Sequence, residues 1–200
     1  MLLSAAIWVP IVAGALVLAV GDRRPEAMRW TALYGAILGF LVTIPLYTGF
    51  DLANPGMQFV QDLAWIERFN IRYHLGVDGI SMLFVLLNSF ITILIVIAGW
   101  TVVENRVAQY YASFLVLSGL LNGVFAALDA VLFYVFFEAT LIPMFIIIGI
   151  WGGPARVYAA VKFFLYTLLG SLLMLATFIY LYNVTNGSFE ILYSQNLVHR

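Results

Sequence analysis

Six long runs with almost no charge divide this 200-residue sequence and constrain its fold. Each run is close to the roughly 20 residues that a helix needs to cross about 30 Å of hydrocarbon. In a bilayer the backbone must satisfy its own hydrogen bonds, so these runs form helices, whereas barrel strands would alternate over about ten residues. The predicted helices are Leu2–Val20, Trp30–Phe50, Gly79–Trp100, Tyr110–Leu128, Ala130–Trp151 and Tyr158–Tyr182.

The composition supports the same class, an all-α polytopic membrane protein. Apolar residues make up 64% of the chain and charged residues 10%. The apolar runs make the lipid bilayer the expected partner, and the net charge of −1 suggests neither nucleic acid nor an anionic surface as a partner. No Lys or Arg precedes the first run, so we expect a retained helix and not a cleaved signal peptide.

One sizeable polar segment interrupts the helices, at residues 51–78. Apolar and polar residues alternate in "FNIRYHLGVD", which is typical of a strand, and "MQFVQDLAWI" before it is predicted to complete an extramembrane hairpin. His74 in this hairpin is expected to be structural or exposed. The predicted organisation is 1–50 (two helices), 51–78 (loop with hairpin), 79–109 (third helix and loop), 110–182 (three helices) and 183–200 (polar segment).

The arginines predict an orientation, because short loops rich in Lys and Arg stay on the cytoplasmic side. The loops after the first, third and fifth runs hold more arginines than the opposite side does. They hold Arg23, Arg24, Arg29, Arg106 and Arg156, against Arg68, Arg72 and Arg200. We therefore expect the N-terminus on the periplasmic side of a bacterial inner membrane.

Small and polar residues at helical spacing predict contacts between the helices. The pairs Gly35/Gly39, Gly119/Gly123 and Gly149/Gly153 have the spacing that lets helix backbones approach closely. Ser118 and Asn122, and Thr167 and Ser171, each form a polar face. Two interpretations of these faces stay open: hydrogen bonds between helices, or ordered water between them.

Glu138 is the most unusual residue, a single acid within the run Ala130–Trp151. It lies about 12 Å from the start of that helix, at 1.5 Å per residue. A charged side chain there costs about 2.5–3.5 kcal/mol, so intramembrane acids usually have a function. Pro143 lacks the N–H that would bond the carbonyl of Ala139, so a kink or loosened turn is expected beside the acid. Proton exchange and a structural hydrogen bond are the two alternatives for Glu138.

Lys162 is the second unusual residue, the one lysine among nine basic residues, and lies inside the sixth run. A lysine can lose its proton when desolvated, whereas arginine stays protonated. Near the helix end it can equally snorkel to the interface. Counted from the shared loop, Glu138 and Lys162 differ in depth by about 12 Å, so a direct ion pair is not expected.

The sequence predicts no metal or cofactor on this chain. It has no cysteine, which excludes disulfides, thiolate-bound zinc and iron–sulfur clusters. Its two histidines lie in separate polar segments, which argues against a haem or metal site.

Three motifs carry a resemblance to a known family: "YHLGVDGISMLF", "LFYVFFEATLIPMFIIIGIWGG" and "RVYAAVKFFLYTLLGSLLML". They resemble the subunit M family of proton-translocating NADH:quinone oxidoreductase (respiratory complex I), whose mitochondrial counterpart is chain 4. The resemblance implies that Glu138 is a central proton-handling acid and that Lys162 lies near the same hydrated route. Asp78 and Gly79 fall in a structural motif.

The resemblance also implies an antiporter-like inverted-repeat fold, beginning at the fourth helix, and other membrane-arm subunits as partners. Redox chemistry is expected on those partners, with no cofactor here. Family members have about fourteen helices and pair the fifth-helix glutamate with a lysine on helix seven. These six runs contain neither that lysine nor the second repeat, so a complete proton path cannot be drawn on them.

Two classes of function follow from these residues. The first is a membrane subunit that couples electron transfer to proton translocation through Glu138 and Lys162, with a subunit of a multi-component sodium/proton antiporter as a variant. The second is a structural membrane subunit without ion transport.

Overall fold

A computed structural model describes residues 1–21, 25–54, 56–184 and 189. It contains six helices long and apolar enough to cross a membrane, which confirms the predicted class. They are α1 (Leu2–Val20), α2 (Pro25–Thr48), α3 (Gly79–Val102), α4 (Val107–Ala126), α5 (Ala130–Trp151) and α6 (Arg156–Val184). The predicted bounds of α1 and α5 are confirmed. Helix α2 begins before the predicted Trp30 because Pro25 suits the first turn of a helix.

Three of the arginines that predict the orientation lie outside the described part of the chain. These are Arg23, Arg24 and Arg200, and most of the predicted polar segment 183–200 also lies outside it.

The predicted hairpin is confirmed between α2 and α3. Strand β1 (Gln58–Ile66) pairs antiparallel with β2 (Ile71–Val77), and a 3₁₀ turn, η1 (Glu67–Phe69), joins them. Arg72 on β2 forms an ion pair of 2.8 Å with Asp62 on β1, the one ion pair that the described residues contain. The Tyr73 hydroxyl donates to Ser4 Oγ on α1 at 3.3 Å. The hairpin is thereby held against the bundle.

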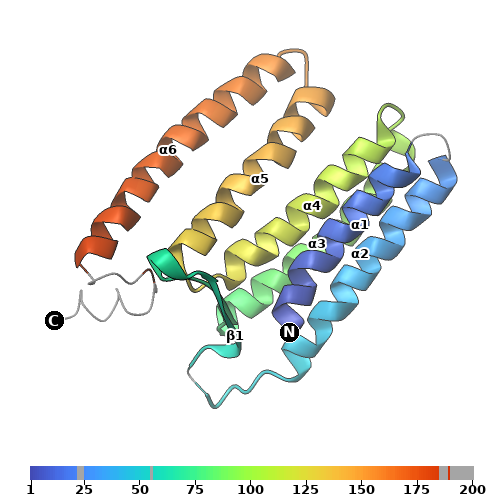
Figure 1. Ribbon diagram of the computed structural model, residues 1–200. Helices are drawn as coiled ribbons and strands as arrows, with labels where there is room; N and C mark the ends of the chain where they lie inside the picture. The colour runs from blue at the N-terminus through green and yellow to red at the C-terminus, as the bar shows by residue number, and fades with distance from the viewer. Residues whose placement is uncertain (22–24, 55, 185–188, 190–200) are drawn as a thin grey trace.

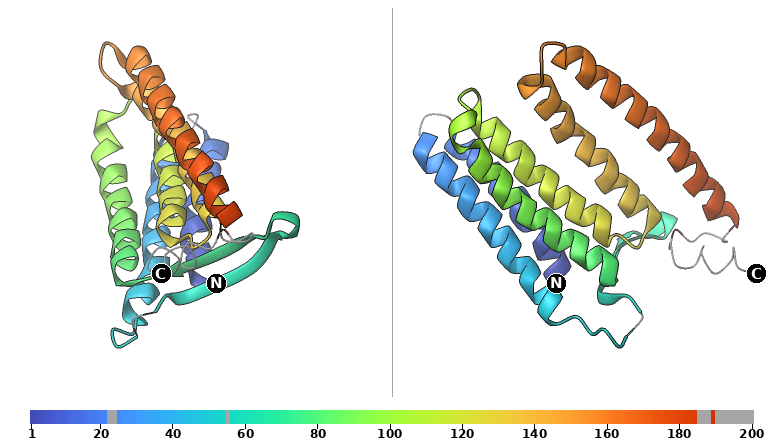
Figure 2. Two further views of the ribbon diagram at one scale, coloured as in Figure 1. Left: turned by 90° about the vertical axis from the view of Figure 1, so that its left-hand side faces the viewer. Right: turned by 180° about the vertical axis from the view of Figure 1, so that it is seen from behind.

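The helices form a four-helix bundle with two further helices at its side. Helices α1 to α4 pack against one another, α5 packs on α4, and α6 packs on α5 (Figure 1). The hairpin and the α4–α5 connection lie at the end of the bundle at which α1 begins, and the α3–α4 and α5–α6 loops lie at the opposite end (Figure 2). Most of α6 is exposed, because it contacts the rest of the described chain mainly through α5.

Close backbone approach is confirmed for two of the three glycine pairs. A Cβ at Gly35 would lie 2.5 Å from the Ala13 Cβ, and one at Gly123 would lie 2.7 Å from the Phe136 ring. The expectation is wrong for Gly149/Gly153, since a Cβ at Gly153 would meet no atom within 4 Å. This glycine lies in the α5–α6 turn, where no helix packs over it.

Side-chain amides connect α1, α3 and α4. Asn88 Nδ2 donates to Asn122 Oδ1 and to the Ser118 carbonyl, both at 2.8 Å. Asn122 Nδ2 in turn donates to the Ala6 carbonyl on α1 at 2.9 Å. Hydrogen bonding between helices is therefore confirmed for the Ser118/Asn122 face. On α6, by contrast, the Ser171 hydroxyl donates to a carbonyl of its own helix.

Candidate functional site

Glu138 lies within α5 and is half-buried. Its Oε1 atom is shielded from solvent and has no hydrogen-bond partner among the described residues. A buried oxygen without a partner costs about 1–3 kcal/mol, and more when the group is charged. Most buried polar atoms have a partner, so this oxygen is an exception that calls for an explanation.

Two hydroxyls border the same carboxylate. The Tyr134 hydroxyl, one helical turn before Glu138, is within hydrogen-bonding reach of Glu138 and of Ser171 on α6. Ser171 is buried on α6, which runs antiparallel to α5 (Figure 1). The tyrosine proton faces the Glu138 carboxylate, whereas the Ser171 hydroxyl donates to the Leu168 carbonyl of its own helix. The arrangement forms a short polar chain between α5 and α6.

Sequence reasoning identified the acid but missed Tyr134. The only available signal was the spacing of four residues between Tyr134 and Glu138, which places both on one face of the helix. That signal is weak in a run so rich in aromatic residues.

Asp129 fixes the start of α5. Its Oδ1 accepts hydrogen bonds from the N–H groups of Val131 and Leu132 at 2.9 and 3.0 Å, as an N-cap residue does. Its Oδ2 accepts from the backbone N–H of Arg72 on β2 at 3.3 Å. Beside this bond, the Leu128 N–H donates to the carbonyl of His74 on β2 at 2.9 Å. The hairpin and the helix that carries Glu138 therefore share one junction.

We expect Asp129→Ala to lower the free energy of unfolding by about 1 kcal/mol, the usual contribution of an N-cap side chain. Asp129→Asn keeps an oxygen acceptor and should preserve the stability at neutral pH. Burial raises the pKa of Asp129 above its ordinary value of 3.8, although the N–H bonds to Leu132, Arg72 and Val131 oppose this.

A raised pKa favours the protonated form in the folded state. Lowering the pH through the folded-state pKa towards 3.8 should therefore stabilise the wild type relative to Asp129→Asn. Thermal unfolding in detergent measures both effects. Equal stability of the wild type and Asp129→Ala would contradict the capping role.

Lys162 lies on the exposed face of α6. Its Nζ is 5.7 Å from the ring centre of Tyr158 and 5.8 Å from that of Tyr166, within the range of cation–π contacts. Lys162 precedes Ser171 by nine residues, about 14 Å along the helix at 1.5 Å per residue. The structure brings Tyr134 and Ser171 to Glu138 and does not bring Lys162 there.

Asp78 and Gly79 open α3, and Asp78 is its N-cap. The carboxylate of Asp78 accepts from the Ser81 N–H at 2.7 Å, and its own N–H donates to Ser81 Oγ at 2.9 Å. The Ser81 bonds hold the pKa of Asp78 below 3.8. These reciprocal bonds give Asp78 a structural role, as expected.

Comparison with known proteins identifies a matching family and related proteins. The family described as "NADH:quinone oxidoreductase/Mrp antiporter, TM" matches residues 127–199. NADH-quinone oxidoreductase subunit M of Rhodobacter capsulatus is 53% identical over 185 residues. That match covers 90% of this chain but 36% of the relative, so this chain spans about a third of its length.

Solved structures agree with this relationship. A chain of respiratory complex I from Thermus thermophilus with bound NADH superposes with a TM-score of 0.82 at 32% identity, over 96% of this chain and 38% of that one. A chain of the Mrp complex from Dietzia sp. superposes with a TM-score of 0.78 over 94% of this chain and 20% of that one. At 18% identity the second likeness shows a shared fold alone.

The six helices and the hairpin are thus accompanied by a specific sequence match. The chain is a homologue of NADH-quinone oxidoreductase subunit M and has the fold of the antiporter-like subunits of respiratory complex I.

Proposed function

We propose that this chain helps to move protons across the membrane as a non-redox subunit of NADH:quinone oxidoreductase. In this proposal Glu138 takes up and releases a proton, and electron transfer on partner subunits drives the exchange. The chain itself holds no cofactor. Its N-terminus lies on the periplasmic side of a bacterial inner membrane, and the hairpin lies on the same side.

One observation carries the proposal: the buried Oε1 of Glu138 has no partner among the described residues. A glutamate whose role was only to join two helices would be expected to use both oxygens, because an unsatisfied buried acceptor is costly. A carboxyl group that exchanges protons instead needs one position open to a donor. Tyr134 and Ser171 supply hydroxyls at the other side of the site.

The sodium/proton antiporter alternative has weaker support. Its solved relative shares 18% identity with this chain, against 32% for the complex I relative. The structural alternative is supported by the contact of Glu138 with Tyr134, which a packing role also explains. A transport experiment with a sodium ionophore tests the antiporter alternative, and the variant Glu138→Gln tests the structural one.

The test compares inverted membrane vesicles from strains in which the gene for this chain is intact, deleted, or restored. NADH oxidation is followed by absorbance and proton uptake by a pH-sensitive dye, with and without a sodium ionophore. We expect NADH-driven proton uptake to disappear on deletion, to return on restoration, and to be unaffected by the ionophore. Unchanged uptake in the deletion strain would contradict the proposal, and uptake abolished by the sodium ionophore would support the antiporter alternative.

Lys162 is proposed to bias the charge state of Glu138 through its positive charge, at a distance. Lys162→Ala should then lower NADH-driven proton uptake several-fold, whereas Lys162→Arg should retain most of it because the charge is kept. The measurement is the initial rate of dye quenching in vesicles with equal amounts of complex. An unchanged rate in Lys162→Ala would assign this lysine to the membrane interface.

A further inference from the structure

Residues 127–129, which connect α4 to α5, lie alongside strand β2. Three contacts form this junction, and each joins a residue of the connection to a residue of β2. Ala127 forms an antiparallel bridge with Leu75, the Leu128 N–H donates to the His74 carbonyl at 2.9 Å, and the Arg72 N–H donates to Asp129 Oδ2 at 3.3 Å. The helix that carries Glu138 therefore begins at a fixed point on the hairpin.

Strand β2 is itself held in the core of the bundle. Leu75 and Val77 are fully buried in a cluster that also contains residues of α1, α3, α4 and α5. A Cβ at Gly76 would lie 2.7 Å from Leu128 Cδ1, so the strand and the connection are in close contact. Protein interiors are close-packed, and a close-packed element resists displacement. Strand β2 is therefore a fixed support for α5.

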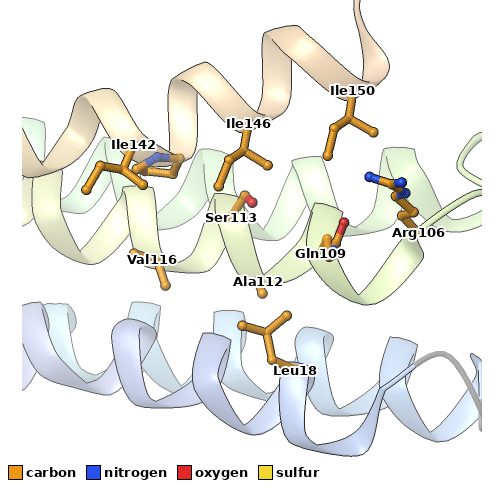
Figure 3. A pocket seen from close by; sticks show the side chains of 10 residues that line it. Leu18, Arg106, Gln109, Ala112, Ser113, Val116, Ile142, Ile146 and Ile150 are labelled. Carbon is orange, nitrogen blue, oxygen red and sulfur yellow. The ribbon is translucent and has the colours of Figure 1, made fainter.

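The packing of α5 differs between its two halves. Its buried residues all lie within Ala130–Pro143. From Ile142 onward a cavity of about 400 Å³ lies between α5 and the pair α1 and α4, and Ile146 and Ile150 extend towards it from α5 (Figure 3). Within the described part of the chain, the first turns of α5 therefore set its height and its rotation in the bundle.

Glu138 belongs to the firmly packed half of α5. It follows Asp129 by nine residues, about 14 Å along the helix at 1.5 Å per residue. No proline interrupts the helix between them, and Pro143 releases the carbonyl of Ala139, which lies beyond Glu138. A regular helix transmits a shift of its first turn to the residues that follow. A rise or rotation at Asp129 would therefore move the Glu138 carboxylate relative to Ser171 on α6.

We propose that the bond from the Arg72 N–H to Asp129 Oδ2 is a clamp that holds α5 in place, which makes Asp129 a positioning residue for Glu138. This inference rests on the proposed function, since it names the group that positions the same acid. The two oxygens of Asp129 have different roles. Oδ1 caps the helix through the N–H groups of Val131 and Leu132, whereas Oδ2 forms the clamp.

Two variants remove the clamp from opposite sides. Arg72→Pro deletes the backbone N–H that donates to Asp129, whereas the matched control Arg72→Ala keeps that N–H. Asp129→Ser keeps an oxygen for the N-cap but has no second oxygen for Arg72. The two variants change different residues, so one that fails to assemble leaves the other as the test.

The measurement is NADH-driven proton uptake by inverted vesicles that contain equal amounts of the complex. We expect Arg72→Pro and Asp129→Ser to lower uptake about tenfold, because a displacement of about 1 Å at a reacting group can cost up to a hundredfold in rate. Arg72→Ala should retain most of the uptake.

A disulfide gives a readout that a loss of stability alone would not move. Leu75 and Ala127 are opposed in an antiparallel bridge, where Cα atoms lie about 4.5–5.5 Å apart, within the range of a disulfide. The chain has no cysteine, so Leu75→Cys with Ala127→Cys gives one defined bond within it. In the Asp129→Ser background we expect oxidation to restore proton uptake and a reductant to reverse the recovery. With Asp129 intact, oxidation should leave uptake unchanged, because β2 is a fixed support.

Three results would overturn the inference. They are normal uptake in both clamp variants, a deficit in Asp129→Ser that oxidation does not restore, and a loss of uptake on oxidation with Asp129 intact, since the hairpin would then have to move. Glu138→Gln separates these results from the proposed function. Loss of uptake in Glu138→Gln beside normal uptake in the clamp variants would remove the positioning role alone, whereas normal uptake in Glu138→Gln would contradict proton exchange itself.

Discussion

Glu138→Gln is expected to abolish NADH-driven proton uptake while the complex that contains this chain still assembles. Glutamine keeps the length and shape of the side chain and its contact with Tyr134, but it has no proton to exchange. A positioned proton-transfer group contributes about a hundredfold or more to a rate, so uptake should fall by that factor. Quinone reduction should fall with it if the two processes are coupled.

The matched control is Glu104→Gln, the same chemical change at an exposed acid between α3 and α4. It should leave proton uptake and quinone reduction unchanged. Native gel electrophoresis of both membranes checks that the complexes assemble in equal amounts. Normal proton uptake in an assembled Glu138→Gln complex would mean that the acid is structural.

The second large effect is expected where α1 and α4 touch. A Cβ at Gly119 would collide with the Ile7 carbonyl oxygen and lie 2.6 Å from Ile11 Cγ1. The carbonyl belongs to the backbone of α1 and cannot move by rotating a side chain. Gly119→Ala should therefore push the two helices apart and lower the free energy of unfolding by about 1–3 kcal/mol, the usual cost of overpacking.

Gly170→Ala on α6 is the matched control, because a Cβ there would meet no atom within 4 Å. Alanine in a helix is favoured over glycine by about 0.5–1 kcal/mol, so this variant should be as stable as the wild type or slightly more stable. Thermal unfolding of the purified protein in detergent compares them. Equal melting temperatures for Gly119→Ala and Gly170→Ala would contradict the close contact.

The helices were predictable because lipid removes the alternatives. An apolar run of about 20 residues has no other way to satisfy its backbone in hydrocarbon, so length and composition suffice. The hairpin was predictable because alternation in "FNIRYHLGVD" has a period of two. The glycine pairs were less informative, since Gly149/Gly153 has the same spacing as Gly119/Gly123 but makes no close contact.

The site was predictable only in part. Glu138 stands out in the sequence because a charge in an apolar run is costly. The partners of Glu138 depend on how α5 and α6 are rotated about their axes, and nearly uniform apolar surfaces do not reveal that rotation. Tyr134 therefore emerges from the structure alone, as does the position of Ser171 beside it. Lys162 was singled out for its rarity, and rarity does not tell which side of α6 faces α5.

The packing of α1 against α4 has a consequence for biosynthesis. Asn122 donates to the carbonyl of Ala6, 116 residues earlier in the chain. Ribosomes add about 5–20 residues per second, so α1 waits roughly 6–23 s in the membrane before that donor is made. During this interval the face of α1 that packs against Gly119 is not covered by α4. The insertion machinery or lipid must shelter α1 until the fourth helix arrives, so the order of synthesis and the order of packing differ in this bundle.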